Sequence, residues 1–112
     1  MEDRVKFEFS GGDLTCLLFG DIDHHAEEGM RGIIDRALYE YRPRRLLLDF
    51  SGVGFTDSSG LGLIMGRRRT CAELSVEMSL IGVSDEIMRI LRLTGLIREI
   101  DVLQKSKTLG EV

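Results

Sequence analysis

The sequence predicts one small α/β domain, built as a mixed β-sheet with an antiparallel N-terminal strand and flanking helices. Its 112 residues are the length of a single ordinary domain, which we place at residues 1–112. Strand-like and helix-like hydrophobic patterns alternate along the chain, and this order implies parallel strands joined by right-handed crossovers. The first two strand patterns are separated only by a short glycine turn, so they are expected to form a hairpin.

A hairpin and a long helix are expected in the N-terminal part of the chain. Apolar residues alternate with charged ones over residues 5–9, a turn signal follows at residues 10–13, and residues 14–19 predict the second strand. An apolar stripe with helical spacing then runs over residues 26–41. Asp23 is a candidate N-cap of this helix, and Pro43 ends it.

The C-terminal part continues the alternation of strands and helices. Residues 46–50 form a nearly continuous apolar run, which predicts a central strand buried on both faces. A loop over residues 51–57 leads to a helix at about residues 58–74, and alternation over residues 76–80 predicts another strand. Ser84 or Asp85 is expected to cap a short helix that Gly95 closes. Residues 97–103 suit a last strand or turn, and the tail from residue 106 suits one more short helix.

Composition and charge narrow the classes of function. The chain has 15 basic and 19 acidic side chains and a formal charge of −4, which argues against direct contact with DNA or RNA phosphates. No apolar run approaches the roughly 20 residues that a membrane helix needs, so no membrane association is expected. The two cysteines, Cys16 and Cys71, are far apart in the sequence and are interpreted as reduced core thiols of a cytoplasmic protein.

Glycine is over-represented, with 13 residues against one proline. Three glycines lie inside the helix expected at residues 58–74, and each costs about 1 kcal/mol relative to alanine. Close packing or close approach by a partner would offset this cost. A helical wheel assigns a core face to Leu61, Ile64, Met65, Cys71 and Ala72, and it leaves outside that face Gly62, Leu63 and Gly66. This arrangement predicts a smooth patch for a partner, unless the two glycines face a neighbouring element of the same domain.

The start of this helix is the strongest candidate for a functional site. It follows the carboxyl end of a buried strand, and ligand sites of open α/β sheets tend to lie at the carboxyl ends of the strands. A helix N-terminus offers free N–H donors and a partial positive charge, so a phosphate on Ser58 would be favoured there. The simpler alternative is that Asp57 or Ser58 serves only as an N-cap.

Three short motifs resemble those of a known family. The run DSSGLG at residues 57–62 resembles the phosphorylation motif of the anti-sigma factor antagonists, which are STAS domains. The run GDIDHH at residues 20–25 is similar to the loop before the first helix in the sporulation branch of that family. The run LRLTGL at residues 91–96 is similar to the end of its third helix. The resemblance covers nearly the whole chain, with the elements in matching order.

The resemblance implies a STAS fold and a role in transcription regulation by partner switching, without cofactor and without catalysis by the chain itself. The unphosphorylated protein would bind an anti-sigma factor that is also a serine kinase, with ADP or ATP bound, and so free a sigma factor. The kinase would phosphorylate Ser58 and end the binding, and a serine phosphatase would reverse this. The partner-binding surface implied in this way comprises Asp21, Asp23, Asp57, Ser59, Gly60, Gly62, Leu63, Gly66 and Arg67.

Several other interpretations are weaker. Asp21, Asp23, His24 and His25 are possible metal ligands, but no further ligand is evident, and we expect no metal. Ser58 lacks the Gly-x-Ser-x-Gly context of a hydrolase nucleophile. The glycine pairs do not complete a dinucleotide-binding fingerprint. Two alternatives stay open: a STAS module of another signalling system, and a STAS domain that binds a nucleotide or small molecule. The basic run at residues 67–69 would be solvated or contact acidic groups of a partner.

Overall fold

The computed structural model describes residues 4–104, and the elements follow the predicted order. The strands and helices are β1 (Val5–Ser10), β2 (Asp13–Phe19), α1 (His24–Tyr41), β3 (Arg45–Gly52), α2 (Ser58–Glu73), β4 (Glu77–Ile81), α3 (Asp85–Thr94), the 3-10 helix η2 (Leu96–Arg98) and β5 (Asp101–Leu103). Residues 97–103 therefore contribute a short last strand. The helix expected from residue 106 lies outside the described residues.

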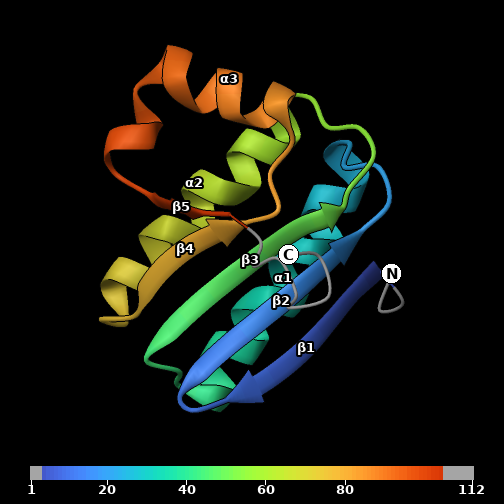
Figure 1. The fold of residues 1–112 in the computed structure, drawn as a ribbon. Helices are drawn as coiled ribbons and strands as arrows, with labels where there is room; N and C mark the ends of the chain where they lie inside the picture. The colour runs from blue at the N-terminus through green and yellow to red at the C-terminus, as the bar shows by residue number, and fades with distance from the viewer. Residues whose placement is uncertain (1–3, 105–112) are drawn as a thin grey trace, which may run out of the picture.

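The five strands form one mixed sheet in the order β1-β2-β3-β4-β5 (Figure 1). The β1 and β2 strands pair antiparallel, and the other neighbours pair parallel, which confirms the predicted sheet. The hairpin turn consists of Gly11 and Gly12, with φ of +60° and +86°. Positive φ at both central residues is what a two-residue hairpin turn requires, and glycine adopts it without strain.

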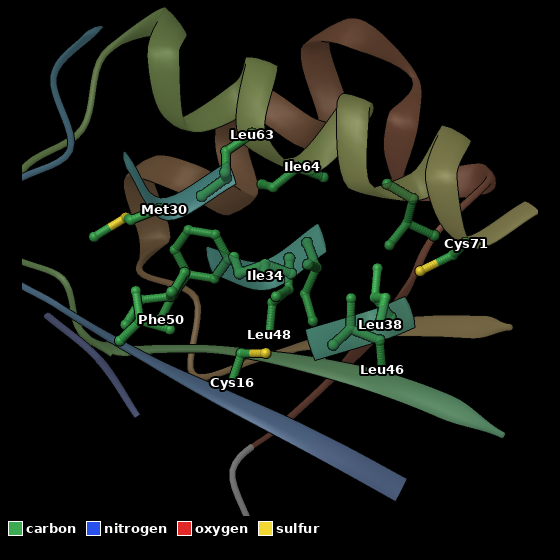
Figure 2. Packing of buried hydrophobic residues seen from close by; sticks show 14 of the residues in the cluster. Cys16, Met30, Ile34, Leu38, Leu46, Leu48, Phe50, Leu63, Ile64 and Cys71 are labelled. Carbon is green, nitrogen blue, oxygen red and sulfur yellow. The ribbon is translucent and has the colours of Figure 1, made fainter. Parts of the chain in front are cut away.

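The core lies between the sheet and the helices on one of its faces (Figure 2). Helices α1 and α2 lie side by side there, and α3 packs against α2 through Ile87 and Leu91. The fully buried side chains include Leu14 and Leu18 of β2, Leu46 and Leu48 of β3, Met30, Ile34 and Leu38 of α1, and Leu63 and Ile64 of α2. Both cysteines are buried here as free thiols, as predicted.

The expectation that β3 is buried on both faces holds only in part for the face opposite the helices, where Asp49 is buried but Leu47 is not. The strand is central, but successive side chains of a strand point to opposite faces. Leu46, Leu48 and Phe50 therefore face the helices, whereas Leu47 lies on the other face and is only half-buried. The α-helices of residues 4–104 all lie on the first face, because each crossover connects a strand to its next neighbour in the same direction along the sheet.

The predicted core face of α2 also needs correction. Its buried residues are Gly60, Leu63, Ile64, Arg67 and Cys71, whereas Met65 is 45% exposed and Ala72 is exposed. The helical wheel weighted apolar side chains, and it therefore excluded a stripe that contains a glycine and an arginine. Because α1 packs alongside α2 in addition to the sheet, the buried sector is rotated toward Leu63 and Arg67.

Candidate functional site

Two loops meet at the carboxyl ends of β2 and β3 and carry the predicted site. The Ile22 N–H donates to the Phe55 carbonyl at 2.8 Å, and the Phe55 N–H donates to Asp21 Oδ1 at 2.9 Å. Ile22 and Thr56 form a parallel bridge. The loop before α1 is thereby held against the loop before α2. Asp21 is consequently a structural link between the loops, and its side chain is still exposed.

Asp57 is the N-cap of α2, which resolves the choice between Asp57 and Ser58. Its carboxylate accepts a hydrogen bond from the Ser59 N–H at 2.7 Å. This hydrogen bond lowers the pKa of the Asp57 carboxyl, so the cap is anionic at neutral pH. Ser58 is the first residue of the helix and is exposed. Its hydroxyl therefore lies at the positive end of the helix and remains accessible to another protein.

The N-terminus of α1 contributes the other side of the site. Asp23 caps α1 by accepting from the Ala26 N–H at 2.8 Å, as predicted. His24 Nε2 lies 3.0 Å from Glu28 Oε1. A shallow hollow between the two helices is lined by His24, Glu27 and Arg31 of α1 and by Ser58, Ser59 and Gly62 of α2. Sequence reasoning missed Arg31, although its position seven residues after His24 places both on one side of a helix.

Two of the three helix glycines leave open space, and one does not. A Cβ built on Gly62 or on Gly66 meets no atom within 4 Å. Neither glycine is therefore packed against a neighbouring element, although Glu27 and Arg31 of α1 line the same hollow as the glycines. This second hollow continues along α2 past Met65 and Thr70. Together the two hollows form a groove that follows the exposed side of α2 from Ser58, and we call it the α2 groove.

Gly60 has a different role, because it is buried against the preceding loop. A Cβ there would lie 2.9 Å from the Thr56 Cβ and 3.0 Å from the Thr56 Cγ2, closer than carbon atoms pack. The Thr56 hydroxyl in turn donates to the Ile22 carbonyl at 3.3 Å. Gly60 thus permits the tight junction between α2 and the two loops, and it does not contribute to an exposed surface.

Leu63 and Arg67 are likewise not surface residues. Leu63 is fully buried, and the Arg67 side chain is only 5% exposed. Arg67 Nε lies 2.8 Å from Asp35 Oδ1 and joins α2 to α1. Burial raises the pKa of the Asp35 carboxyl, and it lowers that of the Arg67 guanidinium. The predicted surface is therefore reduced to residues of the two helix N-termini and the α2 groove.

The described residues offer neither a metal centre nor a membrane helix. In residues 4–104 no three His, Cys, Asp or Glu side chains are grouped so that they could hold a metal ion. Asp21 and Asp23 accept backbone hydrogen bonds, which accounts for them without a metal. Over the same residues, no helix combines the length and apolar character that crossing a bilayer requires.

The fold and the exposed serine at the start of α2 define the class of protein. The model of the family described as "STAS domain" matches residues 4–111. The chain belongs to the STAS domain family.

The most informative relatives are anti-sigma factor antagonists. The chain is 31% identical over 98 residues to the anti-sigma F factor antagonist of Paenibacillus polymyxa, covering 88% of this chain and 84% of the relative. It is 33% identical over 83 residues to that of Lysinibacillus sphaericus, covering 74% and 71%. The anti-sigma-B factor antagonist of Listeria monocytogenes is 27% identical over 100 residues, covering 88% and 83%. These likenesses place the chain among the anti-sigma factor antagonists of the family.

Solved structures agree with this placement. The unphosphorylated anti-sigma factor antagonist SpoIIAA has a TM-score of 0.69 and 25% identity, covering 96% of this chain and 92% of that one. The Bacillus cell fate determinant SpoIIAA in its phosphorylated form has a TM-score of 0.74 and 26% identity, covering 92% of each chain. The predicted STAS fold of the SpoIIAA type is confirmed.

Proposed function

We propose that this anti-sigma factor antagonist is a two-state switch operated by phosphorylation of Ser58. In the unphosphorylated state it binds an anti-sigma factor that is also a serine kinase, with ADP or ATP bound, and a sigma factor is released in the cytoplasm. The observation that carries the proposal is the accessible Ser58 hydroxyl at the start of α2, next to a groove kept free of side chains by Gly62 and Gly66.

The binding surface in this proposal is smaller than the sequence motif suggested. Its exposed or half-exposed members are Asp21, Asp23, Asp57, Ser59, Gly62 and Gly66, together with Arg31 and Met65 from the rims of the α2 groove. Because the glycines present only backbone, a partner helix or loop can approach α2 closely there. Gly60, Leu63 and Arg67 support this surface from beneath.

The chemical step is a phosphoryl transfer in which this chain is the substrate. The Ser58 Oγ attacks the γ-phosphorus of ATP, the bond from phosphorus to the ADP oxygen breaks, and the serine proton passes to a base of the kinase. Exposure of Ser58 at a helix terminus satisfies the access that this transfer needs. A serine phosphatase would then hydrolyse the phosphoserine and return the hydroxyl.

The electrostatics of the site explain why the modification would end binding. A phosphoserine carries about −1.5 to −2 charges at pH 7. It would stand next to the anionic Asp57 cap, in the hollow that Glu27 and Arg31 also line. The added charge and bulk would fill the end of the α2 groove. Local repulsion is therefore sufficient, without a change of fold.

Two features support the sporulation branch over the stress-response branch. The relatives named as anti-sigma F factor antagonists are 31% and 33% identical to this chain over 98 and 83 residues. The anti-sigma-B factor antagonists are 27% identical over 100 residues in Listeria monocytogenes, and 36% identical over only 53 residues in Staphylococcus aureus. SpoIIAA, one of the structural neighbours, has solved structures in its phosphorylated and unphosphorylated forms. Reconstitution with purified sigma factors of both kinds would separate the branches, since only one anti-sigma complex should be dissociated by this chain.

The proposal is tested by incubating the chain with its cognate kinase and ATP, followed by peptide mass spectrometry. One phosphoryl group is expected, on Ser58, and the Ser58→Ala variant should bind the kinase without being modified. Ser59→Ala is the matched control for the site of transfer: it removes the neighbouring hydroxyl, and the phosphoryl group should still be found on Ser58. Transfer to Ser59, or no transfer to a chain that binds the kinase, would refute the phosphorylation switch.

A further inference from the structure

The β1 strand forms one edge of the sheet and offers a row of backbone groups for pairing. Figure 1 shows it as the outermost strand, next to β2 alone. Ser10 and Asp13 flank the two-residue turn and, as in other hairpins of this kind, form a hydrogen-bonded pair. Backbone groups of alternate residues point the same way, so those of Lys6 and Glu8 also point to β2. Those of Val5, Phe7 and Phe9 point outward from the sheet.

The side chains next to this edge are apolar on the helix face. Val5 and Phe7 line a groove under α1, together with Ile33, Ala37 and Tyr41. Phe9 lies beyond them, with its ring 5.1 Å from that of Tyr41 between centroids. Phe9 is 48% exposed and Tyr41 44% exposed. Large aromatic side chains therefore stay in water at a point where an added strand would cover them.

The opposite face of the same strand carries one positive and one negative charge. Lys6 and Glu8 are both exposed. Lys6 Nζ lies 5.9 Å from the centroid of the Phe19 ring, and Glu8 has no ion pair with another residue of the described chain. The edge thus has an apolar face and a charged face with both signs.

We propose that β1 is a homodimerisation edge, on which a second copy of this chain adds its own β1 antiparallel to form a continuous sheet. A residue whose backbone N–H and C=O point away from β2 can pair only with such a residue of the second copy. The twofold axis of an antiparallel pair that uses most of the strand therefore passes through residue 6, 7 or 8. An axis at residue 6 places Lys6 opposite Lys6 of the second copy. An axis at residue 8 places Glu8 opposite Glu8. Like charges directly opposite are destabilising.

The axis at Phe7 is the register that satisfies every outward group of the strand. It pairs Phe7 with Phe7, and Val5 with Phe9, as hydrogen-bonded pairs. Lys6 then lies opposite Glu8 of the second copy, and Glu8 opposite its Lys6, at the shorter Cα spacing of about 4.5 Å found in non-hydrogen-bonded pairs. The strand is therefore complementary to itself in charge, in hydrogen bonding and in its apolar face. Arg36 and Glu40 on the groove rim add one further charge of each sign.

The proposal is tested by sedimentation velocity of the full chain from low micromolar to near-millimolar concentration. The wild type should show a monomer–dimer equilibrium. Lys6→Glu and Glu8→Lys each create two like-charge pairs, so each should raise the dissociation constant roughly tenfold or more. The double variant Lys6→Glu/Glu8→Lys should return it to near the wild-type value. Glu86→Lys, an exposed charge change on α3, is the control and should have no effect.

Mixing the two single variants gives the sharpest readout. A strand with Glu at residues 6 and 8 complements a strand with Lys at both, so an equimolar mixture should associate where neither variant does alone. All the altered side chains are exposed, and circular dichroism spectra should be unchanged. A chain that stays monomeric, takes up a strand only from a different protein, or dimerises equally well with both charge reversals would overturn the proposal.

Discussion

Replacing each glycine of α2 by alanine separates the two roles that the structure gives them. Alanine at Gly62 or Gly66 meets no atom within 4 Å, and alanine is favoured over glycine in a helix by about 0.8–1.0 kcal/mol. Each substitution should therefore raise the free energy of unfolding by about that amount. Alanine at Gly60 would lie 2.9 Å from the Thr56 Cβ, and Thr56 is β-branched and bonded to the Ile22 carbonyl. Overpacking of this kind costs typically 1–3 kcal/mol, so Gly60→Ala should destabilise.

Urea unfolding followed by circular dichroism measures these differences, and binding to the anti-sigma factor measures the second effect. Gly62→Ala and Gly66→Ala should be more stable than the wild type and yet bind more weakly, because their methyl groups project into the α2 groove. Stability and binding would thus change in opposite directions. A stabilised variant with unchanged affinity at both positions would refute the role of the groove, and a stable Gly60→Ala would refute the tight junction.

Three further predictions concern buried and capping groups. The hydrogen bond from the Ser59 N–H lowers the pKa of the Asp57 carboxyl, so the ionised cap stabilises the fold fully above the ordinary pKa of 3.8. This stabilisation is lost as the pH falls through the lower pKa of the folded state. The melting temperature, measured as a function of acid pH, should show the loss, and the Asp57→Asn variant should show a flatter pH dependence. Arg67→Met leaves the half-buried Asp35 carboxylate without its cation, so the free energy of unfolding in urea should fall by about 2 kcal/mol. This is less than the roughly 3–5 kcal/mol lost when a fully buried pair is broken. The double variant Arg67→Met/Asp35→Leu should recover most of the lost stability. Burial raises the pKa of the Cys71 thiol to about 12 and also raises that of Cys16, so neither should react with a disulfide reagent at pH 8 until denaturant is added.

The hairpin, the helix capped by Asp23 and the order of strands and helices were predictable, because they depend on local periodicity and turn chemistry. The two consecutive glycines set the hairpin register, and Asp23 accepts the hydrogen bond expected of an N-cap. The short helix α3 begins where one of the two candidate caps, Ser84, accepts from the Ile87 N–H. Such features involve residues close in the sequence, and their physics is independent of the tertiary arrangement.

The orientation of α2 was not predictable in the same way, because two neighbours decide it. In the sequence, Arg67 is one of three consecutive arginines that are all expected to be solvated. Only the structure shows that its Nε lies 2.8 Å from Oδ1 of Asp35 in α1. The sequence likewise does not distinguish Gly60 from Gly62, because the contact of Gly60 with the Thr56 side chain depends on the tertiary fold. The candidate site at the start of α2 stays a prediction, whereas the exposed side of that helix was misassigned by part of a helical turn. The contribution of Arg31 required knowledge that the N-termini of α1 and α2 lie together.

The central claim is that a phosphoryl group on Ser58 decides whether the chain binds its partner. Titration calorimetry with the anti-sigma factor and ADP tests it directly, using the same protein before and after phosphorylation by the kinase. The unmodified chain should bind, and the Ser58 phosphoprotein should bind at least about a hundredfold more weakly, as expected when a dianion enters an interface beside the anionic Asp57 carboxylate. Equal affinity of the two forms would contradict the account.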